Sequence, residues 1–271
     1  MQQLRDKGMS MESAILDANF ESEKIRHLDP FTEEGTIKVF FGEPSQGQID
    51  GIAADNRKDL SFELARLEAH SNFRFFSGTT GRMLITFARE TMADEALKLG
   101  MDWLFMVDDD MIVPKKLFHA LARHMDHADI IVPLCFQRVH PYNPVLYKVK
   151  SEVENGVNYI TTDHYLDYPP NNTFEIDAAG FGIVLIRAEI LKKIKKPWFF
   201  SNVQLGEDLY FCVRAKQHGF KILCDSRIKI CHLGFPPVVT DLDYLKANKD
   251  YLLKNRKVEI ESLNGSEKPI I

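Results

Sequence analysis

Residues 103–114 read WLFMVDDDMIVP, an apolar run of strand-forming residues that ends in three consecutive aspartates before apolar residues resume. A short apolar run of this kind is typical of a strand buried on both faces of a sheet. Adjacent carboxylates repel one another and destabilise a fold unless a cation offsets their charge. The stretch therefore predicts a buried strand whose carboxyl end carries a site for a cation.

Segments with strand and helix patterns alternate on both sides of this strand. Strand patterns occur in TIKVFFGEP (36–44), FRFFSG (73–78) and DIIVPLCF (129–136), and helix patterns in KDLSFELARLEAH (58–70), RMLITFARETMADEALKLG (82–100) and KKLFHALARHM (115–125). Such alternation predicts an α/β fold with a mostly parallel sheet and helices on both faces. Ligands of these sheets bind at the carboxyl ends of the strands, which is where the aspartates lie.

The second half of the chain is less regular. Residues 141–172 suggest extended hairpin segments with a turn at Asn155-Gly156, and they predict a smaller antiparallel region. The segment 241–257 predicts a helix that packs through Leu242, Leu245 and Leu252 or Leu253. We expect an N-terminal arm or helical extension over 1–35, a main domain over 36–240, and a C-terminal helix and tail over 241–271.

Composition limits the classes of function. The 271 residues are 45% hydrophobic with a formal net charge of −5, which argues against nucleic acid as a partner except as a modified acceptor. No apolar run approaches the roughly 20 residues that span a membrane, and the N-terminus lacks the apolar centre of a signal peptide. We expect a cytoplasmic protein with four free thiols, able to form a homo-oligomer through its N-terminal arm.

The acidic turn has a chemical interpretation and a plain one. On an extended turn, Asp108 and Asp110 point the same way and can grip one Mg²⁺ or Mn²⁺, whereas Asp109 points elsewhere. Alternatively, the three residues solvate a turn and favour the positive end of the following helix. One aspartate would suffice for that purpose, so the use of three favours the metal.

Two later motifs carry further polar candidates. Glu207 and Asp208 open a predicted helix in GEDLYFCVRA, and His232 follows a short strand in KICHLG. Each has an ordinary explanation, a favourable helix dipole for the acidic pair and a satisfied histidine for the other. Together with an acidic turn at a strand end, the three separate signals are more informative than any one of them.

In this order and context, these motifs resemble a GT-A fold nucleotide-sugar glycosyltransferase of the broad family 2 type, over about residues 36–235. The resemblance implies that Asp108 contacts the ribose or the metal, that Asp110 is a metal ligand, and that His232 completes the coordination. A nitrogen ligand then favours Mn²⁺ over Mg²⁺. It also implies that Asp208 is the general base and that Glu207 orients it or contacts the acceptor.

Further donor-binding candidates lie at the same end of the predicted sheet. Pro44 ends the first strand, where this fold holds the nucleotide base, although a plain turn explains it equally well. Arg89 lies on the helix before the acidic strand, where it can pair with a donor phosphate or an aspartate, or be an ordinary surface arginine. The donor-binding candidates are therefore Pro44, Arg89, Asp108 and Asp109.

Acceptor-binding candidates lie in DAAGFG, residues 177–182. Asp177 can hold an acceptor hydroxyl, and Gly180 lets backbone approach a sugar closely, with tight packing as the alternative. Two aspartates, Asp50 and Asp55, are equal candidates for reading the base. Trp198 can stack on a sugar ring or support the core.

The sequence thus predicts a metal-dependent transfer of a sugar from a nucleoside-diphosphate sugar to an unidentified hydroxyl acceptor, with inversion. Two alternatives stay open. One is an Asp-x-Asp enzyme of phosphoryl or nucleotidyl transfer, and the other is a non-catalytic, metal-dependent carbohydrate-binding protein of the same fold. Glu207 and Asp208 distinguish the enzyme from the carbohydrate-binding protein, because a protein that only binds has no need of a base.

Overall fold

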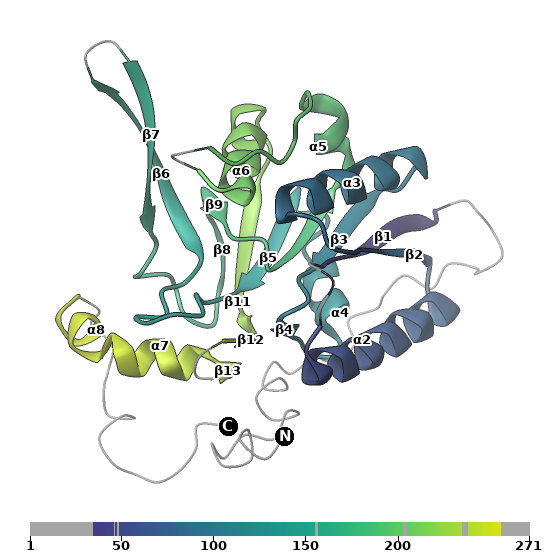
Figure 1. The fold of residues 1–271 in the computed structure, drawn as a ribbon, viewed down its shortest axis with the longest axis horizontal. Helices are drawn as coiled ribbons and strands as arrows, with labels where there is room; N and C mark the ends of the chain where they lie inside the picture. Colours follow the sequence, from purple (N-terminus) through teal and green to yellow (C-terminus); the bar gives the residue numbers. More distant parts are fainter. Residues whose placement is uncertain are drawn as a thin grey trace, which may run out of the picture.

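The computed structural model describes residues 35–255 apart from 46, 48, 155–156, 203–204 and 235–237. Its centre is a seven-stranded sheet with the order β2-β1-β3-β10-β5-β11-β8 (Figure 1). The strands are β1 (Ile37–Pro44), β2 (Phe73–Thr80), β3 (Trp103–Val107), β5 (Ile130–Leu134), β8 (Thr173–Glu175), β10 (Ile183–Arg187) and β11 (Ile222–Lys229). All run in one direction except β8 and β10. The predicted α/β class with a mostly parallel sheet is confirmed.

Strand β3 lies inside the sheet and is buried along its whole length. Its side chains alternate between two hydrophobic cores: Leu104 and Met106 belong to one, and Trp103, Phe105 and Val107 to the other. A strand whose two faces both meet apolar layers has to be apolar at every position. This explains the uninterrupted run that precedes the aspartates.

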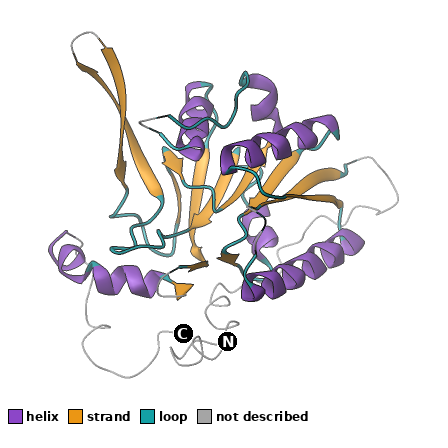
Figure 2. Ribbon diagram, in the orientation of Figure 1, coloured by secondary structure: helices purple, strands orange, loops and turns teal. Residues whose placement is uncertain are grey.

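Helices cover both faces of the sheet, as predicted (Figures 1 and 2). The core that holds Leu104 is closed by α3 (Ile85–Lys98), α5 (Ala188–Lys193) and α6 (Glu207–Gln217). The other core is closed by α2 (Gly51–His70) and α4 (Leu117–Ala122). Helix α2 begins seven residues earlier than the pattern from residue 58 suggested, because Asp50 caps it by accepting a hydrogen bond from Ile52 N at 2.7 Å.

Helix α3 confirms the predicted helix before the acidic strand, and Gly100 follows it with a φ of 65°. Ala88, Met92 and Ala96 are buried as expected. Leu84 and Leu99, which the pattern placed on the same apolar face, are instead 71% and 47% exposed. They flank the helix at its two caps, beyond the reach of the sheet.

Two small antiparallel sheets flank the main one. The first has the order β7-β6-β9 and consists of β6 (Leu146–Glu154), β7 (Val157–His164) and β9 (Ala178–Ala179), which confirms the predicted hairpin region. The Asn155-Gly156 turn lies outside the described residues. The second has the order β13-β12-β4 and consists of β13 (Val238–Val239), β12 (Cys231–Leu233) and β4 (Met111–Ile112). It pairs His232 with Met111, directly after the acidic turn.

The C-terminal segment forms two short helices, α7 (Asp241–Ala247) and α8 (Lys249–Asn255), where one helix was predicted. Leu252 is buried as predicted, but Leu242 and Leu253 are exposed. The main anchor is Tyr244, fully buried, whose hydroxyl donates to Leu166 O at 2.9 Å. A tyrosine satisfies both its ring and its hydroxyl at such a site, which the leucine pattern did not reveal.

Three remaining expectations concern the chain as a whole. Cys135, Cys212, Cys224 and Cys231 are free thiols, and the first three are buried. Among the helices that the structure describes, none combines the length and the apolar character needed to cross a membrane. The predicted N-terminal arm, with its role in oligomerisation, lies outside the described residues except for Gly35.

Candidate active site

A cavity of about 1270 Å³ lies where β1 and β3 end at the carboxyl edge of the sheet. Most of the residues predicted for the site line this cavity: Pro44, Arg89, Asp108, Asp109, Asp110, Gly180, Glu207, Asp208 and His232. They come from β1, α3, the acidic turn, the loop before β10, α6 and β12. Asp177 is not among the lining residues.

The backbone of the acidic turn is held by two buried residues of α2. Arg57 Nη2 donates to Asp108 O at 2.9 Å and to Met111 O at 3.2 Å, while its Nε pairs with Glu43 at 2.8 Å. Asn56 donates to Val113 O and accepts from Val113 N, both at 2.8 Å. The turn therefore has a fixed backbone even though its side chains face the cavity.

This support was not predicted from the sequence, although a signal was present. Asn56 stands four residues before Leu60, and Leu60 four before Leu64, so all three fall on the face of α2 that packs on the sheet. A polar residue on the apolar face of a helix needs partners inside the protein. The backbone of an irregular turn supplies them here.

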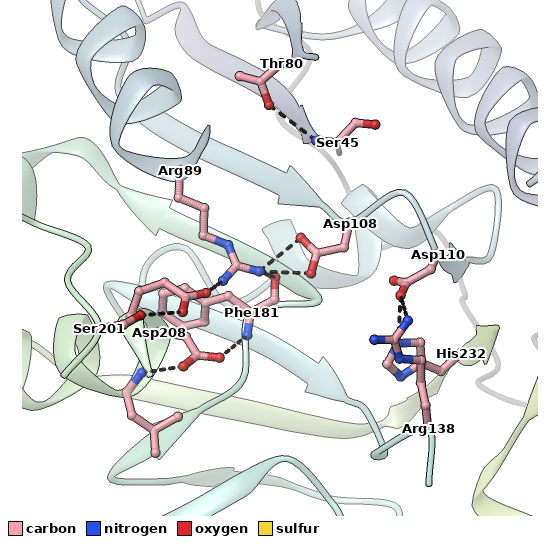
Figure 3. Close-up of polar contacts among 12 residues, drawn as sticks. Ser45, Thr80, Arg89, Asp108, Asp110, Arg138, Phe181, Ser201, Asp208 and His232 are labelled. Carbon is pink, nitrogen blue, oxygen red and sulfur yellow. Dashed lines mark hydrogen bonds and ion pairs between the residues drawn. The ribbon is translucent and has the colours of Figure 1, made fainter. Parts of the chain in front are cut away.

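Arg89 connects the acidic turn to helix α6. Its side chain is 3% exposed, and Nη2 reaches Asp108 Oδ1 at 3.0 Å, Asp108 Oδ2 at 2.9 Å and Phe181 O at 3.1 Å. Nη1 pairs with Glu207 Oε1. Figure 3 shows the contacts of Arg89 with Asp108 and Phe181. Of the roles considered from sequence, pairing with an aspartate is the one observed, and Arg89 is not a surface residue.

The guanidinium of Arg89 thus interacts electrostatically with several carboxylates. Burial opposes the charge on Arg89, but Asp108, Asp208 and Glu207 outweigh it and raise the pKa of the guanidinium. Burial raises the pKa of Asp108 to about 6; Arg89 opposes this, whereas Asp110 and Asp208 add to it. Arg89 therefore stays charged while its charge is shared.

Among the residues that the structure describes, only backbone N–H groups donate to Asp208, at the start of α6. Oδ1 accepts from Leu209 N at 2.8 Å and Oδ2 from Phe181 N at 3.3 Å (Figure 3). Burial raises the pKa of this carboxyl, Arg89 opposes the shift and Glu207 adds to it. Within the described part of the chain, no cationic side chain forms an ion pair with Asp208.

The predicted metal triad is assembled only in part. His232 Nε2 lies 3.3 Å from Asp110 Oδ2, and Arg138 Nη1 lies 2.9 Å from the same oxygen. The carboxylate of Asp108 faces Arg89 instead, as Figure 3 shows. Across the described ranges, no group of three or more His, Cys, Asp or Glu is arranged to hold a metal ion.

The two residues that do meet fit a divalent ion. His232 Nδ1 lies 2.8 Å from Phe136 O, so this nitrogen carries the proton and donates it to the carbonyl. In the neutral ring, Nε2 then presents a lone pair toward the carboxylate of Asp110, and two electron-rich atoms facing each other fit a cation between them. One nitrogen and one oxygen ligand suit Mn²⁺, with further positions left for a ligand.

The two acceptor-binding candidates, Asp177 and Gly180, lie in different places. Asp177 accepts from Val149 N at 3.0 Å and pairs with Lys216 at 2.6 Å, so its carboxylate ties β6 to α6. Gly180 does line the cavity, and a Cβ added there would lie 3.1 Å from Val145 Cβ and 3.4 Å from Asp208 Oδ2. The structure therefore brings Gly180 to the site but leaves Asp177 outside it.

The remaining candidates are also resolved by position. Asp50 lines the cavity, whereas Asp55 is exposed and pairs with Lys58. Trp198 is buried, and its indole Nε1 donates to Leu191 O at 3.0 Å and Ile194 O at 2.9 Å. Trp198 supports the core and does not reach the cavity.

No protein-family model and no curated protein matches this sequence. Some solved structures are similar at low identity, with TM-scores below 0.5. A197 from STIV is 19% identical with a TM-score of 0.49, over 75% of this chain and 94% of its own. GalNAc-T7 with UDP, GalNAc and Mn²⁺ is 13% identical with a TM-score of 0.43, over 73% of this chain and 43% of its own. UDP-glucose pyrophosphorylase complexed with UDP-glucose is 9% identical with a TM-score of 0.43, over 81% of this chain and 99% of its own.

The α/β architecture with a mostly parallel sheet that was predicted from the sequence is the one observed.

Proposed function

We propose that this protein transfers a sugar from a nucleoside-diphosphate sugar to an acceptor hydroxyl with the help of a divalent cation. One observation carries the proposal: the Asp110 and His232 pair and the carboxylate of Asp208 line the same cavity. The Asp110 and His232 pair suits a cation that binds a diphosphate, and the carboxylate of Asp208 suits a proton acceptor. The volume of about 1270 Å³ is large enough for a nucleotide, a sugar and part of an acceptor.

On the donor side, Asp110 and His232 would hold Mn²⁺, or Mg²⁺ with lower preference. A divalent ion at this place stabilises the negative charge that develops on a departing diphosphate. Arg82 and Arg138 also line the cavity and add positive charge around an anionic ligand. Pro44, Asp50 and Asp109 line it as well and are proposed to contact the nucleoside.

On the acceptor side, Asp208 takes the proton of the hydroxyl while the hydroxyl oxygen attacks the anomeric carbon and the bond to the diphosphate breaks. Attack by an external hydroxyl in a single displacement inverts the anomeric centre. The environment of Asp208 suits this role, because burial raises its pKa and makes it a better proton acceptor than an exposed aspartate. Gly180 lies beside it, so close that an added Cβ would be 3.4 Å from Asp208 Oδ2.

The same side chains weigh against the alternatives. A phosphatase of the Asp-x-Asp type needs a free aspartate as nucleophile, whereas the carboxylate of Asp108 is engaged by Arg89. Nucleotidyl transfer to a sugar phosphate uses a nucleophile that is already ionised and needs no base. A carbohydrate-binding protein has no use for Asp208 in a position with a raised pKa.

The test begins with thermal shifts in the presence of UDP, GDP, CDP or dTDP, each with and without Mn²⁺. One nucleotide is expected to raise the melting temperature more than the others, and only with the ion, because a ligand that binds the folded state stabilises it. His232→Ala should remove the part that depends on the ion. Hydrolysis of the matching sugar nucleotide by the wild-type protein completes the test, and absence of both binding and hydrolysis would refute the proposal.

A further inference from the structure

The two acidic residues that open α6 have different surroundings. Glu207 is fixed at both carboxylate oxygens: Oε1 pairs with Arg89 Nη1, and Oε2 accepts from Ser201 Oγ at 3.2 Å. Within the described ranges, Asp208 accepts from two backbone N–H groups and from no side chain. Although Glu207 and Asp208 are neighbours in the sequence, the fold gives their carboxylates different surroundings.

Arg89 produces this difference. Its guanidinium lies between the end of β3 and the start of α6, where it contacts Asp108, Glu207 and the carbonyl of Phe181. Phe181 N in turn donates to Asp208. The arginine therefore holds both the side chain of Glu207 and the backbone that carries a donor to Asp208, although it does not touch Asp208 itself.

We propose that Arg89 is a positioning residue: it fixes Glu207 as a structural carboxylate and leaves Asp208 as the member of the pair that accepts a proton. The two terminal nitrogens of Arg89 are occupied by Asp108, Glu207 and the carbonyl of Phe181, which favours this positioning role over contact with a donor phosphate. The role of Asp208 as base rests on the function proposed above. The placement of charge around it does not, and it can be measured without any substrate.

Several titratable or charged groups act on Asp208. Arg89 on α3 favours its charged form, and Glu207 on the same helix opposes it. Asp108 after β3 repels it as well, while Tyr147 on β6 and Cys212 on α6 also lie within range of its charge. Removal of the positive or of the negative neighbour must therefore move its pKa in opposite directions.

The experiment follows the carboxyl carbon of Asp208 by NMR as a function of pH, in full-length protein labelled with ¹³C-aspartate and assigned with Asp208→Asn. Arg89→Gln is expected to raise the pKa of Asp208 by about one pH unit, and Glu207→Gln to lower it by a similar amount. The double variant should lie between the two. Arg89→Lys, which keeps the charge, should remain close to the wild type.

Arg187→Gln is the matched control. Arg187 also pairs with a carboxylate, Asp129 at 2.9 Å, and lies over the Trp103 ring, but it does not line the cavity. It should reduce the melting temperature and leave the titration of Asp208 unchanged. If Arg89→Gln does not fold, the downward change in Glu207→Gln still decides the matter.

Two results would overturn the proposal: equal titration of Asp208 in all folded variants, or a change of the same sign in Arg89→Gln and Glu207→Gln. Either would show that Arg89 does not set the charge of the base. Failure of the proposed function is distinguishable, because it would appear as intact titration changes in a protein that neither binds nor hydrolyses a sugar nucleotide. In an active protein, the acid limb of kcat/KM should follow the same order of variants.

Discussion

Removal of the Asn56 side chain tests how the acidic turn is held. In Asn56→Ala, the amide and the carbonyl of Val113 both lose their partner, each of which lies at 2.8 Å in the wild type. Val113 is buried, so water does not replace either hydrogen bond. The substitution leaves two unsatisfied backbone groups beside the site.

The magnitude follows from that count. A buried polar group without a partner costs about 1–3 kcal/mol, so the two together should lower the free energy of unfolding by about 2–6 kcal/mol. For a domain of this size, each kcal/mol corresponds to about 2–4 °C, so we expect the melting temperature to fall by about 4–24 °C.

Urea unfolding followed by circular dichroism measures the change directly. Asn72→Ala is the control, because Asn72 makes one solvent-exposed hydrogen bond, to Gly35 O at 2.8 Å, and its loss should cost no more than about 0.5 kcal/mol. Equal stability of the two variants would refute the view that α2 fixes the acidic turn. A folded Asn56→Ala protein should also bind nucleotide and Mn²⁺ more weakly than the wild type.

Three further predictions concern catalysis, pH and packing. Asp208→Asn should lower sugar transfer by about 10²–10⁴-fold and leave the thermal shift with nucleotide and Mn²⁺ unchanged; a variant that stays active removes Asp208 from the mechanism. Burial alone would raise the pKa of Asp225, but hydrogen bonds from Arg227 and His124 lower it to about 2 from its ordinary 3.8. Because the carboxyl of Asp225 has a lower pKa in the folded protein than in the unfolded chain, its charged form stabilises the fold by about 2 kcal/mol. This stabilisation is complete above pH 4 and is lost as the pH falls toward 2. Urea titrations between pH 2 and 5 should show this loss in the wild type and not in Asp225→Asn. Gly42→Ala would place a Cβ 2.6 Å from Met92 Sδ and should lower the free energy of unfolding by about 1–3 kcal/mol. In a denaturation assay, the further substitution Met92→Val should recover part of this stability.

Local patterns predicted much of the fold. The strands β1, β2, β3 and β5 and the helix α3 follow from periodicity and turn residues, because each is decided by neighbours in the chain. The place of β10 was not predictable in this way. It lies antiparallel between β3 and β5, and nothing in its own apolar sequence specifies that direction.

The candidate site shows the same division. Asp110, His232 and Asp208 were chosen because their residue types and order suggest the chemistry, and all three line the cavity. Arg57 was missed because its partners, Asp108 O and Met111 O, are backbone atoms more than 50 residues away. Asp177 was assigned to an acceptor because Lys216, 39 residues later, could not be foreseen as its partner.

The insertion of β10 between β3 and β5 also bears on how the chain is made. During synthesis, β3 and β5 leave the ribosome well before Ile183–Arg187, so β3 keeps one unpaired edge, and β5, whose other neighbour β11 follows later still, keeps both. Newly made protein of up to about 180 residues therefore exposes the backbone of its most apolar strands. Aggregation of the nascent chain is the hazard of this topology, and chaperones that cover strand edges are its natural remedy.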